Sequence, residues 1–138
     1  MRPVFAALVL FALILLTGCN NLSGPFSPNV VDILAGSWSG VLDYSISGGI
    51  TTPMTLAFKD EGDGWLSAIL TTGSSIYEDD LVAEVNDKVV LNFDVAGETW
   101  ELVLEGTLVG STTFEGDIIR REAGQNDIPL GTFTASPS

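Results

Sequence analysis

Apolar and polar residues alternate along most of the chain from Ser37 onward, in short runs separated by glycine or by asparagine and aspartate. A period of two puts successive side chains on opposite faces, so each run predicts a half-buried β-strand. The pattern predicts eight strands, at residues 37–46, 53–59, 65–72, 80–85, 89–95, 99–108, 112–120 and 130–135. Because the connections are short, consecutive strands are expected to pair antiparallel. We therefore predict an all-β fold with a meander topology.

Glycines interrupt several of the predicted strands, at Gly40, Gly106, Gly116 and Gly131. A glycine inside a strand leaves a gap beside its neighbours and lets the sheet bend. A curled sheet of short strands closes naturally into a small barrel, which removes its exposed edges. A β-sandwich is the alternative, because strand number and alternation fit both architectures.

The hairpin turn at Gly110 gives an expected register for the strands on either side of it. A turn centred on this residue puts Gly106 opposite Phe114, whose ring would cover the gap that the glycine leaves. The same register puts Arg120 across from Trp100, where a guanidinium group could stack on the indole. These cross-strand contacts are expectations that depend on the turn.

The inward-facing positions of the predicted strands are nearly all apolar. They are Trp38, Leu42, Tyr44, Met54, Leu56, Phe58, Leu81, Val85, Leu91, Phe93, Trp100, Leu102, Leu104, Phe114 and Ile118. An eight-stranded interior is either filled by side chains or holds one small ligand. In the second case the cavity would be lined by Trp38, Tyr44, Phe58, Phe93, Trp100 and Phe114. Both interpretations stay open at this point.

A different pattern occupies the start of the chain, where residues 4–16 form an uninterrupted apolar run after Arg2. The run is shorter than the roughly 20 residues that a membrane-spanning helix needs, which favours a cleaved export signal. It ends in Leu16-Thr17-Gly18-Cys19, which resembles the lipobox of bacterial lipoproteins. The resemblance implies that a peptidase cuts before Cys19, that its thiol carries a diacylglycerol, and that its new amino group is acylated.

The lipoprotein resemblance divides the chain into three parts. Residues 1–18 are the expected signal peptide, 19–36 the lipidated cysteine with a flexible tether, and 37–138 the barrel domain. The tether is rich in proline and small polar residues, with a weak helical turn expected at residues 30–35, capped by Asn29 or Asp32. We expect an envelope protein held on a membrane by its lipid with the domain outside the cytoplasm. By resemblance to enterobacterial sorting, Asn20 is compatible with the outer membrane where the host has one.

The strand that opens the barrel begins Gly36-Ser37-Trp38, and the last strand contains Gly131-Thr132-Phe133-Thr134. Together with the meander between them, these segments look like those of lipocalin and avidin-like barrels. The resemblance implies an antiparallel barrel that serves as a binding module.

Charge narrows the choice of partners. The chain has 18 acidic and five basic residues and a formal net charge of −13. Loss of Arg2 with the signal leaves four basic residues against the same 18, a net charge of −14. An acidic surface of this size repels nucleic acid and anionic lipid, so we expect no nucleic-acid partner and membrane contact through acyl chains alone.

The composition also disfavours catalysis. There is no histidine, which removes the commonest general base and zinc ligand, and the single cysteine, Cys19, is taken by the lipid. The carboxylates fall on turns and outward faces, where nothing separates their pKa values as acid–base chemistry requires. We expect no enzyme activity and no cofactor.

Two acidic clusters remain as candidate features. Asp60, Glu61 and Asp63 share one hairpin turn, a crude resemblance to a weak calcium loop, although a solvated turn is favoured and no metal is expected. On the outer face, the Gly110 turn puts Glu105 opposite Glu115, and directly opposed like charges cost stability. A cation, a basic partner or solvent alone could compensate them.

Two functions follow from these observations. The first is an envelope lipoprotein whose lipocalin-like barrel is a binding module, with a small apolar ligand as one candidate. The alternative is a structural or protein-interaction lipoprotein with a filled barrel, whose acidic outer face meets another envelope protein. The volume of the interior distinguishes them.

Overall fold

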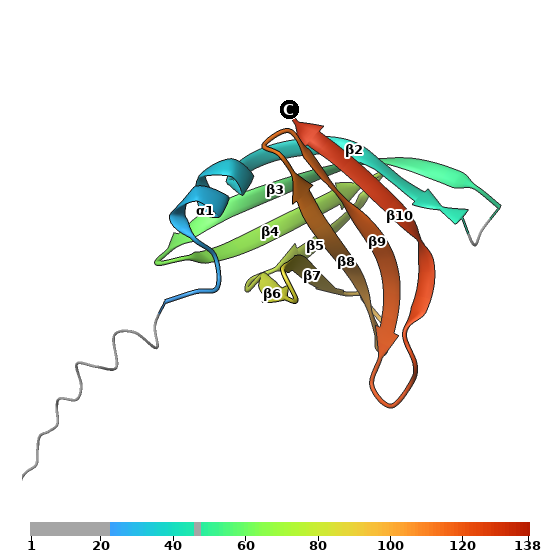
Figure 1. Cartoon of the computed structure of the whole chain (residues 1–138). Coiled ribbons are helices and arrows are strands. Elements are labelled where there is room, and N and C mark those ends of the chain that lie inside the picture. The colour runs from blue at the N-terminus through green and yellow to red at the C-terminus, as the bar shows by residue number, and fades with distance from the viewer. Residues whose placement is uncertain (1–22, 46–47) are drawn as a thin grey trace, which may run out of the picture.

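The computed structural model describes residues 23–45 and 48–138, which form one helix and a single antiparallel sheet (Figure 1). The helix is α1 (Pro28–Leu34). The strands are β2 (Gly36–Tyr44), β3 (Ile50–Gly62), β4 (Trp65–Thr72), β5 (Ser75–Asp79), β6 (Ala83–Val85), β7 (Lys88–Asp94), β8 (Trp100–Val109), β9 (Thr113–Glu122) and β10 (Ile128–Pro137). Their order in the sheet is β5-β4-β3-β2-β10-β9-β8-β7-β6.

Neighbouring strands follow one another along the chain as a meander, and the sheet curls so that the first strand in sequence, β2, pairs with the last, β10. Strand β2 pairs with β10 over a register that includes Leu42 opposite Phe133. The curled sheet surrounds the core, with β5 and β6 as its two edges (Figure 1). The predicted all-β, barrel-like meander is therefore confirmed, and one continuous sheet replaces the β-sandwich alternative.

One strand of this sheet is absent from the sequence prediction. Residues 75–79 form β5, whereas the predicted strand at residues 80–85 is a turn followed by the short β6. From the sequence alone, the acidic run Tyr77-Glu78-Asp79-Asp80 predicts a loop or the start of a strand that is exposed to water. In the structure Asp79 is buried and accepts backbone hydrogen bonds, and Tyr77 packs on Phe93 with 6.1 Å between ring centroids.

The interior of the barrel is filled by large side chains. Phe114 lies at its centre, with ring centroids 6.3 Å from Trp38, 5.8 Å from Phe58 and 5.2 Å from Phe133. The largest fully buried side chains are Trp38, Phe93, Phe114, Leu34, Leu42, Leu56, Leu66, Leu70, Leu91, Leu104, Ile118 and Val82. Strands β2, β3, β4, β7, β8 and β9 all contribute to this cluster, which is what a single packed core requires.

Most of the residues predicted to face inward are buried, but the prediction is wrong for two of them. Leu81 and Val85 are 59% and 53% exposed. Leu81 lies in the turn after β5, and the next residue, Val82, takes the fully buried position. The prediction also missed Leu66 and Leu70, which face inward on β4.

The helical turn expected at residues 30–35 is present as the helix α1, which is packed where part of a flexible tether was predicted. Helix α1 begins at Pro28 and is capped by the side chain of Ser27, which accepts a hydrogen bond from the backbone N–H of Val30, so neither Asn29 nor Asp32 is its cap. Leu34 is fully buried, and its carbonyl accepts a 2.8 Å hydrogen bond from the Trp38 indole N–H. The helix thus packs into the barrel (Figure 1) because one of its faces is apolar.

The register around the Gly110 turn also differs from the prediction by two residues. Val109 pairs with Thr113, which makes a three-residue loop, so Gly106 lies opposite Gly116 and not opposite Phe114. The Phe114 ring still covers the gap, because a Cβ on Gly106 would lie 2.6 Å from ring atoms.

The predicted contact between a guanidinium group and an indole is confirmed. Arg120 lies over the Trp100 ring, 4.7 Å from its centroid, although the residue directly opposite Trp100 is Glu122. The contact therefore runs along the diagonal between neighbouring pairs, which long side chains can reach.

Candidate functional site

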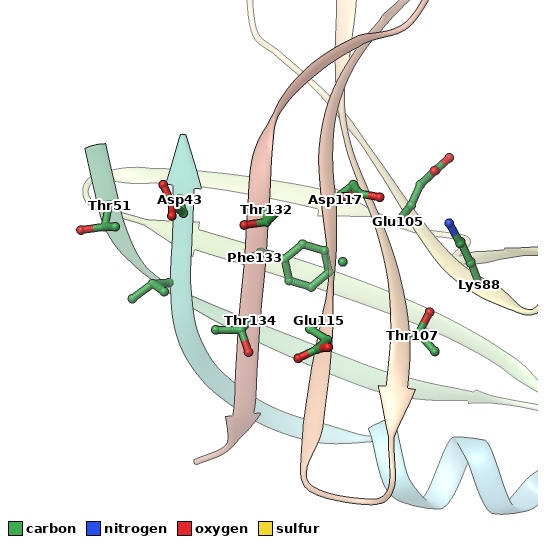
Figure 2. A pocket seen from close by; sticks show the side chains of 12 residues that line it. Asp43, Thr51, Lys88, Glu105, Thr107, Glu115, Asp117, Thr132, Phe133 and Thr134 are labelled. Atoms are coloured by element: carbon green, nitrogen blue, oxygen red, sulfur yellow. The ribbon is translucent and has the colours of Figure 1, made fainter. Parts of the chain in front are cut away.

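A hollow of about 540 Å³ runs across the outer face of the sheet, on strands β2, β10, β9 and β8 and reaching β3 and the start of β7 (Figure 2). We call it the outer trough. It is lined by Val41, Asp43, Thr51, Lys88, Glu105, Thr107, Glu115, Gly116, Asp117, Thr132, Phe133 and Thr134. The hollow lies outside the barrel wall, and the barrel interior is occupied by the core.

The register of the strands arranges the polar side chains of the outer trough in two rows. In the first row, Thr51, Asp43, Thr132, Asp117 and Glu105 follow one another directly across β3, β2, β10, β9 and β8. Directly opposed side chains in antiparallel strands have Cβ atoms about 5 Å apart. Threonine hydroxyls and carboxylates therefore line one continuous path across the sheet.

The second row runs parallel to the first, two residues away along each strand. It contains Val41, Thr134, Glu115 and Thr107, on β2, β10, β9 and β8. Glu105 is thus opposite Asp117 and Glu115 is opposite Thr107, which corrects the predicted opposition of Glu105 and Glu115. A like-charged pair is present as expected, with a different second member.

The backbones of paired strands approach each other closely beneath the outer trough. A Cβ on Gly116 would lie 1.9 Å from the carbonyl oxygen of Glu105, a distance that no real side chain tolerates. A Cβ on Gly40 would likewise lie 1.9 Å from the carbonyl oxygen of Thr134. These two glycines permit neighbouring strands to approach more closely than any side chain would allow.

The negative charge of the outer trough is only partly compensated. Glu105 pairs with Arg121 at 3.2 Å, and Arg121 also binds Asp127 at 2.9 Å. The hydrogen bonds that Arg121 donates to Asp127, and then to Glu105, hold its pKa above the ordinary value, and the same bond lowers the pKa of Asp127. Within residues 23–45 and 48–138, Asp43 and Asp117 form no ion pair.

Glu115 also forms no ion pair within the described part of the chain. Lys88 is the one basic side chain in the lining of the outer trough. The hollow therefore presents an excess of carboxylates to solvent, with hydroxyl groups between them. This arrangement suits cationic groups and hydrogen-bond donors.

The six residues predicted to line an apolar cavity lie in or beside the packed core. Trp38, Phe58, Phe93 and Phe114 are between 0% and 4% exposed, and Phe114 contacts both Trp38 and Phe58. The structure brings these three aromatic rings together in direct contact. Phe93 packs instead on Tyr77.

The other two members of that set are only partly buried. Trp100 is covered by Arg120. Burial, and then the neighbouring Tyr77, raise the pKa of Tyr44 above its ordinary value. Tyr44 and Trp100 therefore lie at the margin of the core cluster rather than in its centre.

The three acidic residues that resemble a weak calcium loop lie at the end of β3 and in the turn to β4, and two of their carboxylates have separate partners. Asp60 accepts a 2.8 Å hydrogen bond from the Gly62 backbone N–H, and Glu61 accepts a 2.6 Å bond from the Ser67 hydroxyl. Asp63 occupies the turn itself, with φ of 55°. The described residues contain no cluster of three or more histidine, cysteine, aspartate or glutamate side chains that could hold a metal ion.

Sequence reasoning found one part of the outer trough and missed the other. Glu105 and Glu115 were recognised as outward acidic positions. Asp43, Thr132 and Thr134 were missed, because they join the site only when β2 pairs with β10. The alternation on the first and last strands, combined with closure of the barrel, is the signal that could have identified them.

The remaining sequence expectations concern the membrane. Cys19 and the apolar run before it lie outside the described residues. In residues 23–45 and 48–138, no helix combines the length and the apolar character needed to cross a bilayer.

Comparison with known proteins supports the fold of this chain. No protein-family model matches it, and neither does any curated protein. Among solved structures, a redesigned β-barrel is similar with a TM-score of 0.60 and 15% sequence identity. The match covers 84% of this chain and 99% of the designed protein. At this level of identity the likeness shows the fold alone, that of a small β-barrel-like protein.

Proposed function

We propose that this protein is a lipid-anchored component of the bacterial envelope, without enzyme activity, that binds a partner protein through the outer trough. The observation that carries the proposal is the packed interior. Leu42, Phe93 and Phe114 are 0% exposed, and aromatic rings meet at the centre. A carrier of apolar molecules needs a cavity of several hundred Å³ in that position.

The outer trough is a hollow that is open to a partner, whereas the interior of the barrel is filled. Its two rows of threonines and carboxylates can accept hydrogen bonds along an extended segment. Asp43, Glu115 and Asp117 lack internal cations among the described residues, so a lysine- or arginine-bearing segment would complement them. The directly opposed Glu105 and Asp117 would also lose part of their repulsion on binding.

The start of the described chain is consistent with attachment through Cys19. Gly24 already donates a 2.6 Å hydrogen bond to the Asp63 carbonyl in the β3–β4 turn. Five residues span at most about 18 Å when fully extended. Lipid on Cys19 would therefore hold the α1 end of the barrel close to the bilayer, in the outer membrane where the host has one.

Replacing Cys19 with serine tests the anchor. We expect Cys19→Ser to move most of the protein from the membrane fraction to the soluble fraction, because several long acyl chains bind a bilayer far more strongly than one. Mass spectrometry of the unaltered protein should show cleavage before Cys19 and the added lipid. Asn21→Ser, which leaves the lipobox intact, is the matched control. Membrane retention of the Cys19→Ser protein without lipid would contradict the anchor.

Neutralising the outer trough tests the partner surface. The double variant Glu115→Gln with Asp117→Asn should bind a ten-residue alternating lysine–threonine peptide about fivefold to thirtyfold more weakly than the unaltered protein, since each of the two exposed ion pairs contributes about 0.5–1 kcal/mol. Affinity measured by calorimetry should also fall with added salt. Glu84→Gln with Asp87→Asn, in the β6–β7 hairpin, removes the same charge elsewhere and should leave affinity within about twofold.

NMR separates this function from that of a carrier. The peptide should shift the backbone signals of Thr132 and Thr134, whereas a panel of fatty acids should leave those of Trp38 and Phe114 unchanged. An acidic peptide of equal length is the control for non-specific binding. Saturable fatty-acid shifts at the buried aromatic residues would contradict the proposal.

A further inference from the structure

The barrel is not closed by backbone hydrogen bonds all the way round. Strands β5 and β6 are the two edges of the sheet. We call the line where β5 lies against β7 the seam. Two side-chain contacts cross it: the Tyr77 and Phe93 rings lie 6.1 Å apart, and one carboxylate oxygen of Asp79 accepts a 2.9 Å hydrogen bond from the Asn92 backbone N–H.

Asp79 takes the place of a missing strand pair at the seam. Strand β6 pairs with β7 as far as Ala83 opposite Val90, so the N–H of Asn92 lies beyond the end of β6. The Asp79 carboxylate accepts that N–H with Oδ2, and its Oδ1 accepts the Leu81 N–H at 3.1 Å. One ionisable side chain therefore connects β5, the following turn and β7.

The surroundings of this carboxylate make its charge costly. Asp79 is 9% exposed and is the one buried charged residue in the described part of the chain. Burial is the largest influence and raises its pKa, the Asn92 and Leu81 hydrogen bonds lower it, and the negative charges of Asp80 and Glu101 raise it again. The net direction is upward from the ordinary value.

Asn92 also has an incompletely satisfied side chain beside the seam. Its side-chain oxygen is buried and has no hydrogen-bond partner within the described residues. Its side-chain nitrogen donates a long 3.5 Å bond to Glu101. Protonation of Asp79 would add a hydrogen-bond donor to a side chain that already contacts the Asn92 backbone.

We propose that Asp79 is a proton-controlled latch, which holds β5 against β7 more firmly when it is protonated and lets the seam open more readily when it is ionised. In the open seam the carboxylate is in water and has an ordinary proton affinity. In the closed seam its proton affinity is higher, so closing takes up protons. The closed state is therefore favoured below the pKa of the closed seam and is weakened as the pH rises through it.

This inference is independent of the proposed anchor and partner, since it concerns only the closure of the barrel. Two neighbouring acidic groups oppose the ionisation of Asp79. They are Asp80, in the turn after β5, and Glu101, on β8. Opening would uncover the core beside Tyr77 and Phe93.

Hydrogen exchange of the Asn92 amide, followed by NMR on the full protein in detergent micelles, tests the latch. After correction for intrinsic exchange, protection should be severalfold higher near pH 4.5 than near pH 7.5. In Asp79→Asn, which keeps the shape and removes the charge, protection should vary by less than about twofold over that range. Asp87→Asn, in the β6–β7 turn, should retain the pH dependence of the unaltered protein.

Three results would overturn the latch. They are an equal pH dependence in Asp79→Asn, highest protection of the Asn92 amide at neutral pH, and a carboxyl titration of Asp79 with its midpoint at or below the ordinary aspartate value. The titration is followed by carbon NMR in the unaltered protein, so it decides the matter even where the variant does not fold. A midpoint above the ordinary value that coincides with the change at Asn92 supports the latch.

Discussion

Replacing Phe114 with alanine is expected to lower the free energy of unfolding by about 3–5 kcal/mol, because it deletes a fully buried ring and leaves a cavity. Domains of this kind have total stabilities of about 5–15 kcal/mol, so the loss is a large share. The ring also contacts Trp38, Phe58 and Phe133, and each aromatic pair adds about 0.5–1.5 kcal/mol beyond simple burial. Urea unfolding followed by tryptophan fluorescence measures the change.

A second measurement on the same variant connects stability to function. If the interior is packed, Phe114→Ala should create a dry pocket that binds a small apolar molecule such as benzene, which the unaltered protein should not bind. Thr113→Ala, the preceding residue on β9, should change stability by no more than about 0.5 kcal/mol. A loss below about 1 kcal/mol for Phe114→Ala would mean that the interior is loosely packed, and would favour the carrier function.

The sequence predicted the sheet well because the period of two is carried by most strands. It failed at Ser75–Asp79, where an acidic segment forms an edge strand. Local polarity suggested solvent there, whereas tertiary structure supplies Asp79 with two backbone N–H groups. The helix at Pro28–Leu34 was underestimated for a similar reason, because its stability comes from packing into the barrel and not from its own sequence.

The candidate site was less predictable than the fold. Acidic positions on β8 and β9 could be recognised from alternation alone, since those strands are neighbours in sequence. The contributions of Asp43 and Thr132 depend on pairing between the first and last strands, which are far apart in the chain. The predicted pairing between β8 and β9 was wrong because of the loop at Gly110. A three-residue loop shifts the register by two residues, so the residue opposite Glu105 is Asp117 and not Glu115.

Gly116→Ala is expected to destabilise the protein by about 3 kcal/mol, at the upper end of the usual cost of overpacking. The new Cβ would lie 1.9 Å from the carbonyl oxygen of Glu105 and 2.7 Å from the Cα of Gly106. These are backbone atoms of the paired strand, and they cannot rotate away as the end of a flexible side chain could. Strands β9 and β8 must therefore separate to make room for the new Cβ. The separation would occur beside the row that contains Glu105 and Asp117, so affinity for the lysine–threonine peptide should fall as well.

Gly110→Ala is the matched control, because it makes the same chemical change in the loop after β8. Its Cβ would meet no atom within 4 Å, and only its φ of 64° is unfavourable for alanine. That conformation costs about 1–2 kcal/mol and leaves the outer trough intact, so peptide affinity should not change. Equal losses of stability in the two variants would contradict the close approach of β9 to β8. A stable Gly116→Ala protein with full peptide affinity would show that the close approach at Gly116 does not shape the outer trough.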